Sequence, residues 1–215
     1  MPSGTSPHPN LHDLHVPHDP QRRFCNCLIS KNVVNLGTEG AVKMALLDIS
    51  GGVATLEKGL QVGGTATLRL SEDGKLVTAF VKGYVSATVE FDGGTLQPIA
   101  DNATFINSTS NVFFRANGVT IDTAGHNIAF SGCVLNAIPR AKAITLTGGG
   151  SLDFTNTTLR FTDKLNGSFT FATADDGVFT SVPTLDPPLS STSVVLSEDG
   201  KTIKIIKAGL VIFVK

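Results

Sequence analysis

One phrase recurs along the chain: a pair of glycines, then a small or polar residue, then a short apolar run. It is found as GGVATL, GGTATL, GGTLQ and GGSLDF, beginning at Gly51, Gly63, Gly93 and Gly149. A second phrase, LSEDGK, occurs twice, beginning at Leu70 and Leu196. Short strands at this spacing fit either an antiparallel sandwich or barrel, or a parallel β-solenoid. Repetition favours the solenoid, in which similar coils stack, although unrelated β-proteins also reuse such turn phrases.

Within the runs, apolar residues occupy alternate positions, as in the sets Ala66, Leu68 and Leu70, and Val85, Ala87, Val89 and Phe91. Alternation with a period of two places one set of side chains on one face of a strand. No sustained 3.6-residue pattern is present, and the 22 glycines are typical of a chain rich in turns. The sequence therefore predicts an all-β fold whose core contains Leu68, Val89, Phe105, Ile121 and Phe154.

The chain divides into three parts of unlike composition. Residues 1–23 hold five of the ten prolines and four of the five histidines, a composition that resists helix and strand and predicts a flexible tail. Residues 24–44 are more apolar and are interpreted as an adapter or cap. Residues 45–215 carry the alternating runs and form the predicted solenoid.

Charge and hydropathy exclude several classes of function. The formal net charge is −1, so the chain has no basic excess to attract nucleic acid or an anionic membrane. No run reaches the ~18 apolar residues of a membrane span, and no phosphate-binding loop, GxSxG or HExxH motif occurs. The start MPSGTSPHPN lacks the basic and apolar regions of a signal peptide, so we expect either a cytoplasmic protein or a leader that is absent from this chain.

The cluster with metal-binding chemistry lies in the N-terminal segment HPNLHDLHVPHDP. It carries four imidazoles within eleven residues, those of His8, His12, His15 and His18. Four such donors can complete a tetrahedron around zinc or copper, although the spacing matches no closed zinc module. Metal binding and a tail without such a role therefore both stay open. No disulfide framework is predicted from the three cysteines Cys25, Cys27 and Cys133.

Three aspartates, Asp92, Asp101 and Asp122, lie in glycine- and asparagine-rich bends between Phe91 and Phe130. Asp and Asn side chains bond backbone groups in turns, so we interpret these carboxylates as structural. Acid–base catalysis would need two of them to converge in a cleft. Stacked coils could bring equivalent positions together, so the sequence leaves convergence open.

Three motifs within residues 90–155 resemble a known family: GGTLQPIADNATFI, then NGVTIDTAGHNIAF, then LTGGGSLDFTNTT. They look like the autotransporter-associated β-strand repeat of bacterial secreted passenger domains. The matching positions are Gly93, Gly94, Thr95, Leu96, Ala103, Thr104, Phe105, Gly118, Ile121, Asp122, Gly125, His126 and Asn127. The resemblance implies a right-handed parallel β-helix on a bacterial surface, with no catalytic residues in the repeat itself.

We therefore expect a non-catalytic, extracellular structural or adhesive module, with a glycan or a host surface as candidate partner. The alternative is a carbohydrate-active β-helix that binds or cleaves polysaccharide through acids aligned in one groove. The closing stretch KTIKIIKAGLVIFVK is apolar and β-branched and must be covered, either by its own chain or by the segment FCNCLISKNVVNL of a neighbour. The second case predicts homo-oligomers or filaments built end to end.

Overall fold

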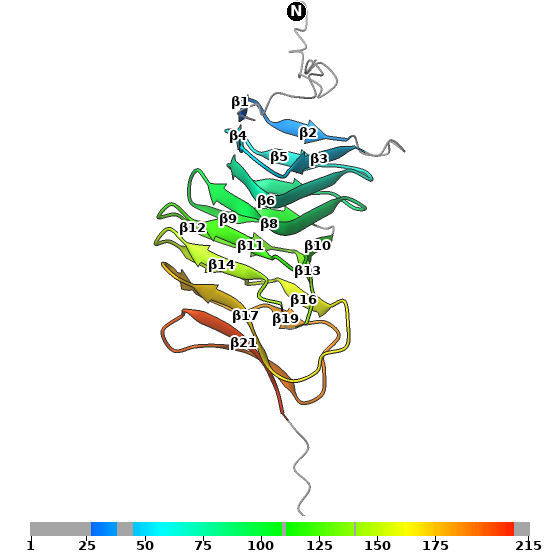
Figure 1. The fold of residues 1–215 in the computed structure, drawn as a ribbon, viewed down its shortest axis with the longest axis vertical. Helices are drawn as coiled ribbons and strands as arrows, with labels where there is room; N and C mark the ends of the chain where they lie inside the picture. Colours follow the sequence, from blue (N-terminus) through cyan, green and yellow to red (C-terminus); the bar gives the residue numbers. More distant parts are fainter. Residues whose placement is uncertain (1–26, 38–44, 109–110, 140, 209–215) are drawn as a thin grey trace, which may run out of the picture.

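Short parallel strands stack along one axis in the computed structural model, which describes residues 27–37, 45–108, 111–139 and 141–208 (Figure 1). No helix occurs in these residues, and the strands form a β-solenoid of about six turns. The all-β, parallel solenoid predicted from the sequence is therefore confirmed. Each coil contributes one strand to each of three ladders, which are called faces 1, 2 and 3 below.

The strands divide among the faces as their pairing shows. Face 1 consists of β3 (Leu46–Ile49), the first part of β6 (Thr67–Thr78), the first part of β8 (Thr88–Pro98), β10 (Asn111–Phe114), β13 (Val134–Ala137), β16 (Thr158–Phe161) and β19 (Thr184–Leu185). Face 2 consists of β1 (Cys27–Ser30), β4 (Val53–Leu56), the second parts of β6 and β8, β11 (Val119–Asp122), β14 (Ile144–Thr147) and β17 (Phe169–Ala174). Face 3 consists of β2 (Val34–Leu36), β5 (Leu60–Val62), β7 (Val81–Gly83), β9 (Asn102–Ser108), β12 (Asn127–Ser131), β15 (Ser151–Asp153) and β18 (Val178–Phe179).

The coils differ in length along the stack, and on face 1 they lengthen toward the C-terminal end. On face 1, Leu68 pairs with Val89, which is 21 positions further along the chain. Leu135 pairs with Leu159, 24 positions further along, and Leu159 pairs with Leu185, 26 positions further along. The added residues lie between the paired strands, so the ladders stay in register while the connections between faces grow.

The core is a column of apolar side chains that point inward from all three faces. The five positions predicted from alternation are fully buried, which confirms that set: Leu68, Val89, Phe105, Ile121 and Phe154. Side chains of neighbouring coils pack on one another inside this column. The ring of Phe154 meets that of Phe130 edge-on at 5.6 Å between centroids and stacks on that of Phe179 at 6.1 Å.

The prediction that Val85 points inward with Ala87 and Val89 is wrong. Val85 is 72% exposed, whereas Ala87 and Val89 in the same run are buried. Val85 lies in the turn between β7 and β8, which is closed by a hydrogen bond from the Ala87 N–H to the Tyr84 carbonyl oxygen. Ser86 in this turn has a φ of 71°, which breaks the extended backbone that alternation requires.

The corner between faces 2 and 3 brings successive coils very close together at Gly150. A Cβ atom there would overlap the carbonyl oxygen of His126 in the preceding coil. The Gly150 N–H donates to Oγ1 of the fully buried Thr123 at 2.8 Å, and the Thr123 hydroxyl donates to the Thr147 carbonyl oxygen at 2.9 Å. Glycine at this position therefore allows both the close approach and the buried hydrogen bonds.

The two ends of the stack differ. At the C-terminal end, the hairpin of β20 (Thr192–Leu196) and β21 (Thr202–Lys207) covers face 2, because β21 pairs antiparallel with β17. Residues 24–44, expected as an adapter or cap, contribute β1 and β2, which pair in parallel with β4 and β5. Strands β1 and β2 therefore belong to the ladders of faces 2 and 3. In the described part of the chain no helix could cross a bilayer.

Candidate functional site

An open trough of about 530 Å³ runs across β9, β12 and β15 on face 3. Its lining, taken from three successive coils, is Asp101, Asn102, Ala103, Asn127, Ile128, Ala129, Ser131, Ser151, Asp153, Thr155 and Asn156. Alternation creates this surface, because Ile128 and Phe130 point inward while Asn127, Ala129 and Ser131 point outward along β12. The methyl groups of Ala103 and Ala129 are short, which leaves the hollow between longer polar neighbours.

Asp101 lies at the N-terminal edge of the trough and binds the next coil. Its Oδ1 accepts a hydrogen bond from the Asn127 N–H at 3.0 Å and lies 3.2 Å from Nδ1 of His126. The bond from the Asn127 N–H, and after it the contact with His126, lower the pKa of Asp101 below its ordinary value. The carboxylate is therefore ionised at neutral pH, with its side chain 67% exposed to a ligand.

Asp153 is the second carboxylate of the trough. Its Oδ1 accepts the Thr155 N–H at 2.6 Å, and its Oδ2 accepts the Thr180 hydroxyl at 2.9 Å. Partial burial raises the pKa of Asp153, but hydrogen bonds from Thr155, Thr180 and Ser181 outweigh this effect and lower it overall. Between the two carboxylates, the Ser151 hydroxyl donates to Asn127 Oδ1 at 2.8 Å.

The trough therefore offers carboxylate, amide and hydroxyl groups held in place by bonds between coils. Such groups hydrogen-bond a polyhydroxylated ligand. Acid catalysis of glycoside cleavage needs a carboxyl group whose pKa is raised so that it holds a proton at working pH. Asp101 and Asp153 are both shifted in the opposite direction, and no aromatic ring lines the trough.

The three aspartates singled out in the sequence do not form one site. Asp92 Oδ1 accepts a bond from Asn117 Nδ2 at 3.0 Å, at the corner between faces 1 and 2. Asp122 Oδ1 accepts the N–H of Ala124 within its own turn at 3.1 Å, as a turn aspartate does. Only Asp101 lies in the trough. Its partner Asn127 bonds both adjacent coils: its N–H donates to Asp101, and its side-chain oxygen accepts from Ser151.

Sequence reasoning missed Ser151 and Asp153, although a signal for them was present. In the phrase GGSLDF the apolar Leu152 lies between two polar residues, and Leu152 is fully buried. A period of two therefore places Ser151 and Asp153 outward on the same face. The sequence does not show which residues of the neighbouring coils stand beside them.

The predicted metal ligands His8, His12, His15 and His18 lie outside the described residues, so zinc or copper binding by them stays a prediction. Within the described ranges, no group of three or more His, Cys, Asp or Glu side chains could hold a metal ion. Cys133 is buried as expected, with its thiol 3.2 Å from the Ile106 carbonyl oxygen. Cys25 also lies outside the described residues.

We expect the Asp101 carboxyl to titrate below its ordinary pKa of 3.8 in the folded protein. Because the folded pKa is lower than the unfolded one, the stability that Asp101 contributes is present above the unfolded pKa and is lost as the pH falls through the folded pKa. NMR titration of the Asp101 side-chain carbonyl carbon measures the midpoint. His126→Ala should move it part of the way back toward 3.8, since the Asn127 N–H remains. A midpoint at or above 3.8 in the unchanged protein would contradict the geometry.

Comparison with known proteins identifies no relative of this chain: no protein-family model matches it, and no curated protein or solved structure is significantly similar to it.

Proposed function

We propose that this protein is a non-catalytic, extracellular structural or adhesive β-solenoid that contacts glycans through the trough on face 3. The observation that carries this proposal is a trough with two ionised carboxylates and a row of amide and hydroxyl groups, but without a carboxyl group suited to be a general acid. The location at a bacterial surface rests on the resemblance of residues 90–155 to passenger-domain repeats.

Several features of the fold support a scaffold role. The three ladders form a rigid surface on which side chains of successive coils stand at the ~4.8 Å spacing of β-strands. A trough that crosses three coils therefore presents a row of polar groups rather than a single deep pocket. Its volume falls within the ~300–1,000 Å³ of small-ligand sites, and its open shape accepts part of a longer chain.

Filling the trough tests the proposal. Ala129→Gln should weaken binding of the best-retained glycan on an array of neutral, amino and sialylated oligosaccharides at least about tenfold, or ~1.4 kcal/mol. The longer side chain occupies the hollow but removes no hydrogen bond that Ala129 makes. The matched control is Thr145→Gln, which changes an outward, half-buried residue of face 2 outside the trough and should leave binding unchanged.

Two results would contradict the proposal. Retention of no glycan by the unchanged protein, or equal affinities of Ala129→Gln and the unchanged protein, would remove the trough as a glycan site. Release of shortened oligosaccharides during incubation would instead favour the carbohydrate-active alternative. Chromatography of the incubated glycans separates binding from cleavage.

A further inference from the structure

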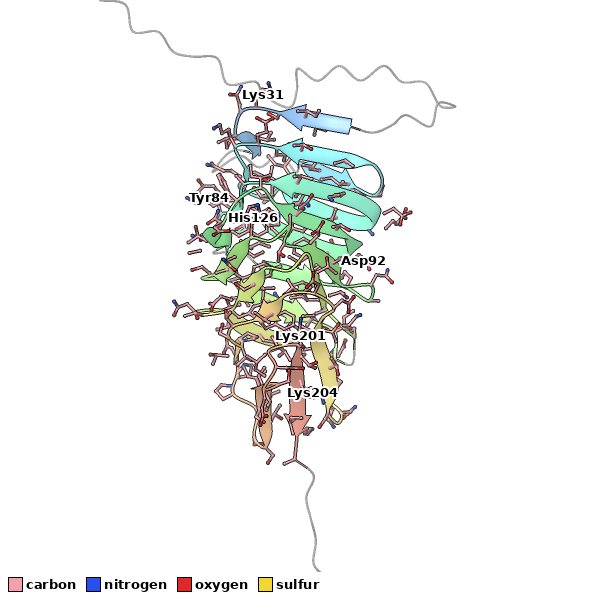
Figure 2. The ribbon with its side chains drawn as sticks, turned by 90° about the vertical axis from the view of Figure 1, so that its left-hand side faces the viewer. Lys31, Tyr84, Asp92, His126, Lys201 and Lys204 are labelled. Carbon is pink, nitrogen blue, oxygen red and sulfur yellow. The ribbon has the colours of Figure 1, made fainter. Side chains whose placement is uncertain are left out.

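The N-terminal end of the stack has open strand edges among the described residues. Each of β1, β2 and β3 pairs with a single strand, the one in the next coil. Figure 2 shows this end of the stack at Lys31. The inward side chains of Leu28, Val34 and Leu47 are only partly buried, whereas Leu36 of β2 and Ile49 of β3 are buried. Among the described residues, the outer edges of these three strands therefore have no strand partner.

At the C-terminal end, the hairpin of β20 and β21 covers strand edges to which a further coil could otherwise pair. On face 2, β21 lies antiparallel to β17 and buries Ile203 and Ile205 completely. On face 3, the Phe179 N–H donates to the Gly200 carbonyl oxygen of the hairpin at 2.8 Å. A second copy therefore cannot extend the parallel stack by placing its first coil directly on the last one.

The segment that follows β21 has the character of a strand that needs a partner. Residues 209–215 read GLVIFVK, with five consecutive apolar residues of high β propensity. They follow Ala208, whose N–H donates to the Ser191 carbonyl oxygen at 2.8 Å. Seven extended residues span about 23–25 Å, which is ample for the four residues of β1.

We propose that residues 210–214 of one copy add to the open edge of β1 in the next copy, as an extra strand on face 2. Face 2 is favoured because β21, which leads into this segment, lies at one end of that face and β1 lies at the other. The contact is head to tail, so it leaves a donor segment and an open edge at the two ends of every assembly.

Two variants separate the donor from the acceptor. Deleting residues 209–215 removes the donor and keeps the edge. Ile29→Pro keeps the donor and blocks the edge, because Ser30 directs its carbonyl toward the Glu57 N–H, so neighbouring Ile29 directs its N–H away from β4. The side chain of Ile29 is 61% exposed, so little core contact is lost. Circular dichroism melts of both variants verify that they remain folded.

Sedimentation velocity over a concentration series gives the result. The unchanged protein should increase in mass with concentration, and each variant alone should stay monomeric. An equimolar mixture should stop at a dimer, because one variant only donates and the other only accepts. Leu46→Pro is the matched control: Leu46 is also 61% exposed and lies on the open edge of β3, and this variant should assemble like the unchanged protein.

The remaining outcomes overturn the proposal. A strictly monomeric unchanged protein whose melting temperature falls on deletion of residues 209–215 would mean that the segment covers its own chain. Assembly that survives this deletion but is lost in Ile29→Pro would mean that two N-terminal ends pair with each other. Equal loss in Ile29→Pro and Leu46→Pro, or a mixture without dimers, would rule out β1 as the acceptor.

Discussion

Phe154→Ala should lower the free energy of unfolding by about 3–5 kcal/mol. Phe154 is fully buried, and its ring lies between those of Phe130 and Phe179 in the preceding and following coils. Truncation removes the apolar surface of one ring and also leaves a cavity that two further rings line, since strands fixed by ladder bonds collapse only partly. Urea denaturation of the purified protein measures the change.

Phe113→Ala is the matched control for Phe154→Ala, because it removes the same ring from an outward position. Phe113 is half-buried on β10, where its ring faces the Arg115 guanidinium at 5.0 Å. We expect a much smaller loss, within about 1 kcal/mol. If the two variants were equally stable, the assignment of inward and outward faces would be wrong.

Gly150→Ala should destabilise the protein by at least about 1–3 kcal/mol, although it adds one methyl group. The added Cβ would overlap the His126 carbonyl oxygen, which belongs to the backbone of the preceding coil and cannot rotate away. Moving the two coils apart would also stretch the bond from the Gly150 N–H to Thr123 Oγ1. Strain and a weakened buried hydrogen bond therefore act in the same direction.

Gly51→Ala is the control for Gly150→Ala. Gly51 also belongs to a glycine pair, but a Cβ there would have no heavy atom within 4 Å. Its substitution should be neutral or slightly stabilising, because alanine has fewer unfolded conformations to lose. Thermal melts of the two variants decide, and a Gly150→Ala protein as stable as Gly51→Ala would contradict the close approach of the coils.

The two copies of LSEDGK show why repeated phrases predict this architecture without locating its corners. In the first copy, residues 70–75 lie inside β6 and turn it from face 1 to face 2. In the second, Leu196 ends β20 and the following residues form the hairpin turn before β21. A glycine-containing polar hexapeptide permits a bend, but the strands that flank it decide whether the bend is a corner or a hairpin.

Part of the candidate site could likewise be predicted from the sequence. Alternation gives the outward direction of Asn127, Ser151 and Asp153, and the inward direction of the apolar residues between them. Alternation does not show which side chains meet across coils, because the separation along the sequence varies. Asp101 bonds Asn127 at a separation of 26 residues, and Ser151 bonds Asn127 at a separation of 24. Coil lengths vary, so sequence spacing alone does not place a second carboxylate beside a first.

The unequal lengths of the coils also limit which strands can pair. Parallel strands with similar apolar patterns can in general slip past one another and pair with the wrong neighbour, since the inward faces would still match. On face 3, for example, a strand displaced by one coil would meet a connection of another length, because Val34 and Leu60 are 26 positions apart whereas Leu60 and Val81 are 21 apart. A coil paired with the wrong neighbour would have a connection too short or too long for the corner between two faces. The native pairing of the strands is therefore favoured over the alternatives.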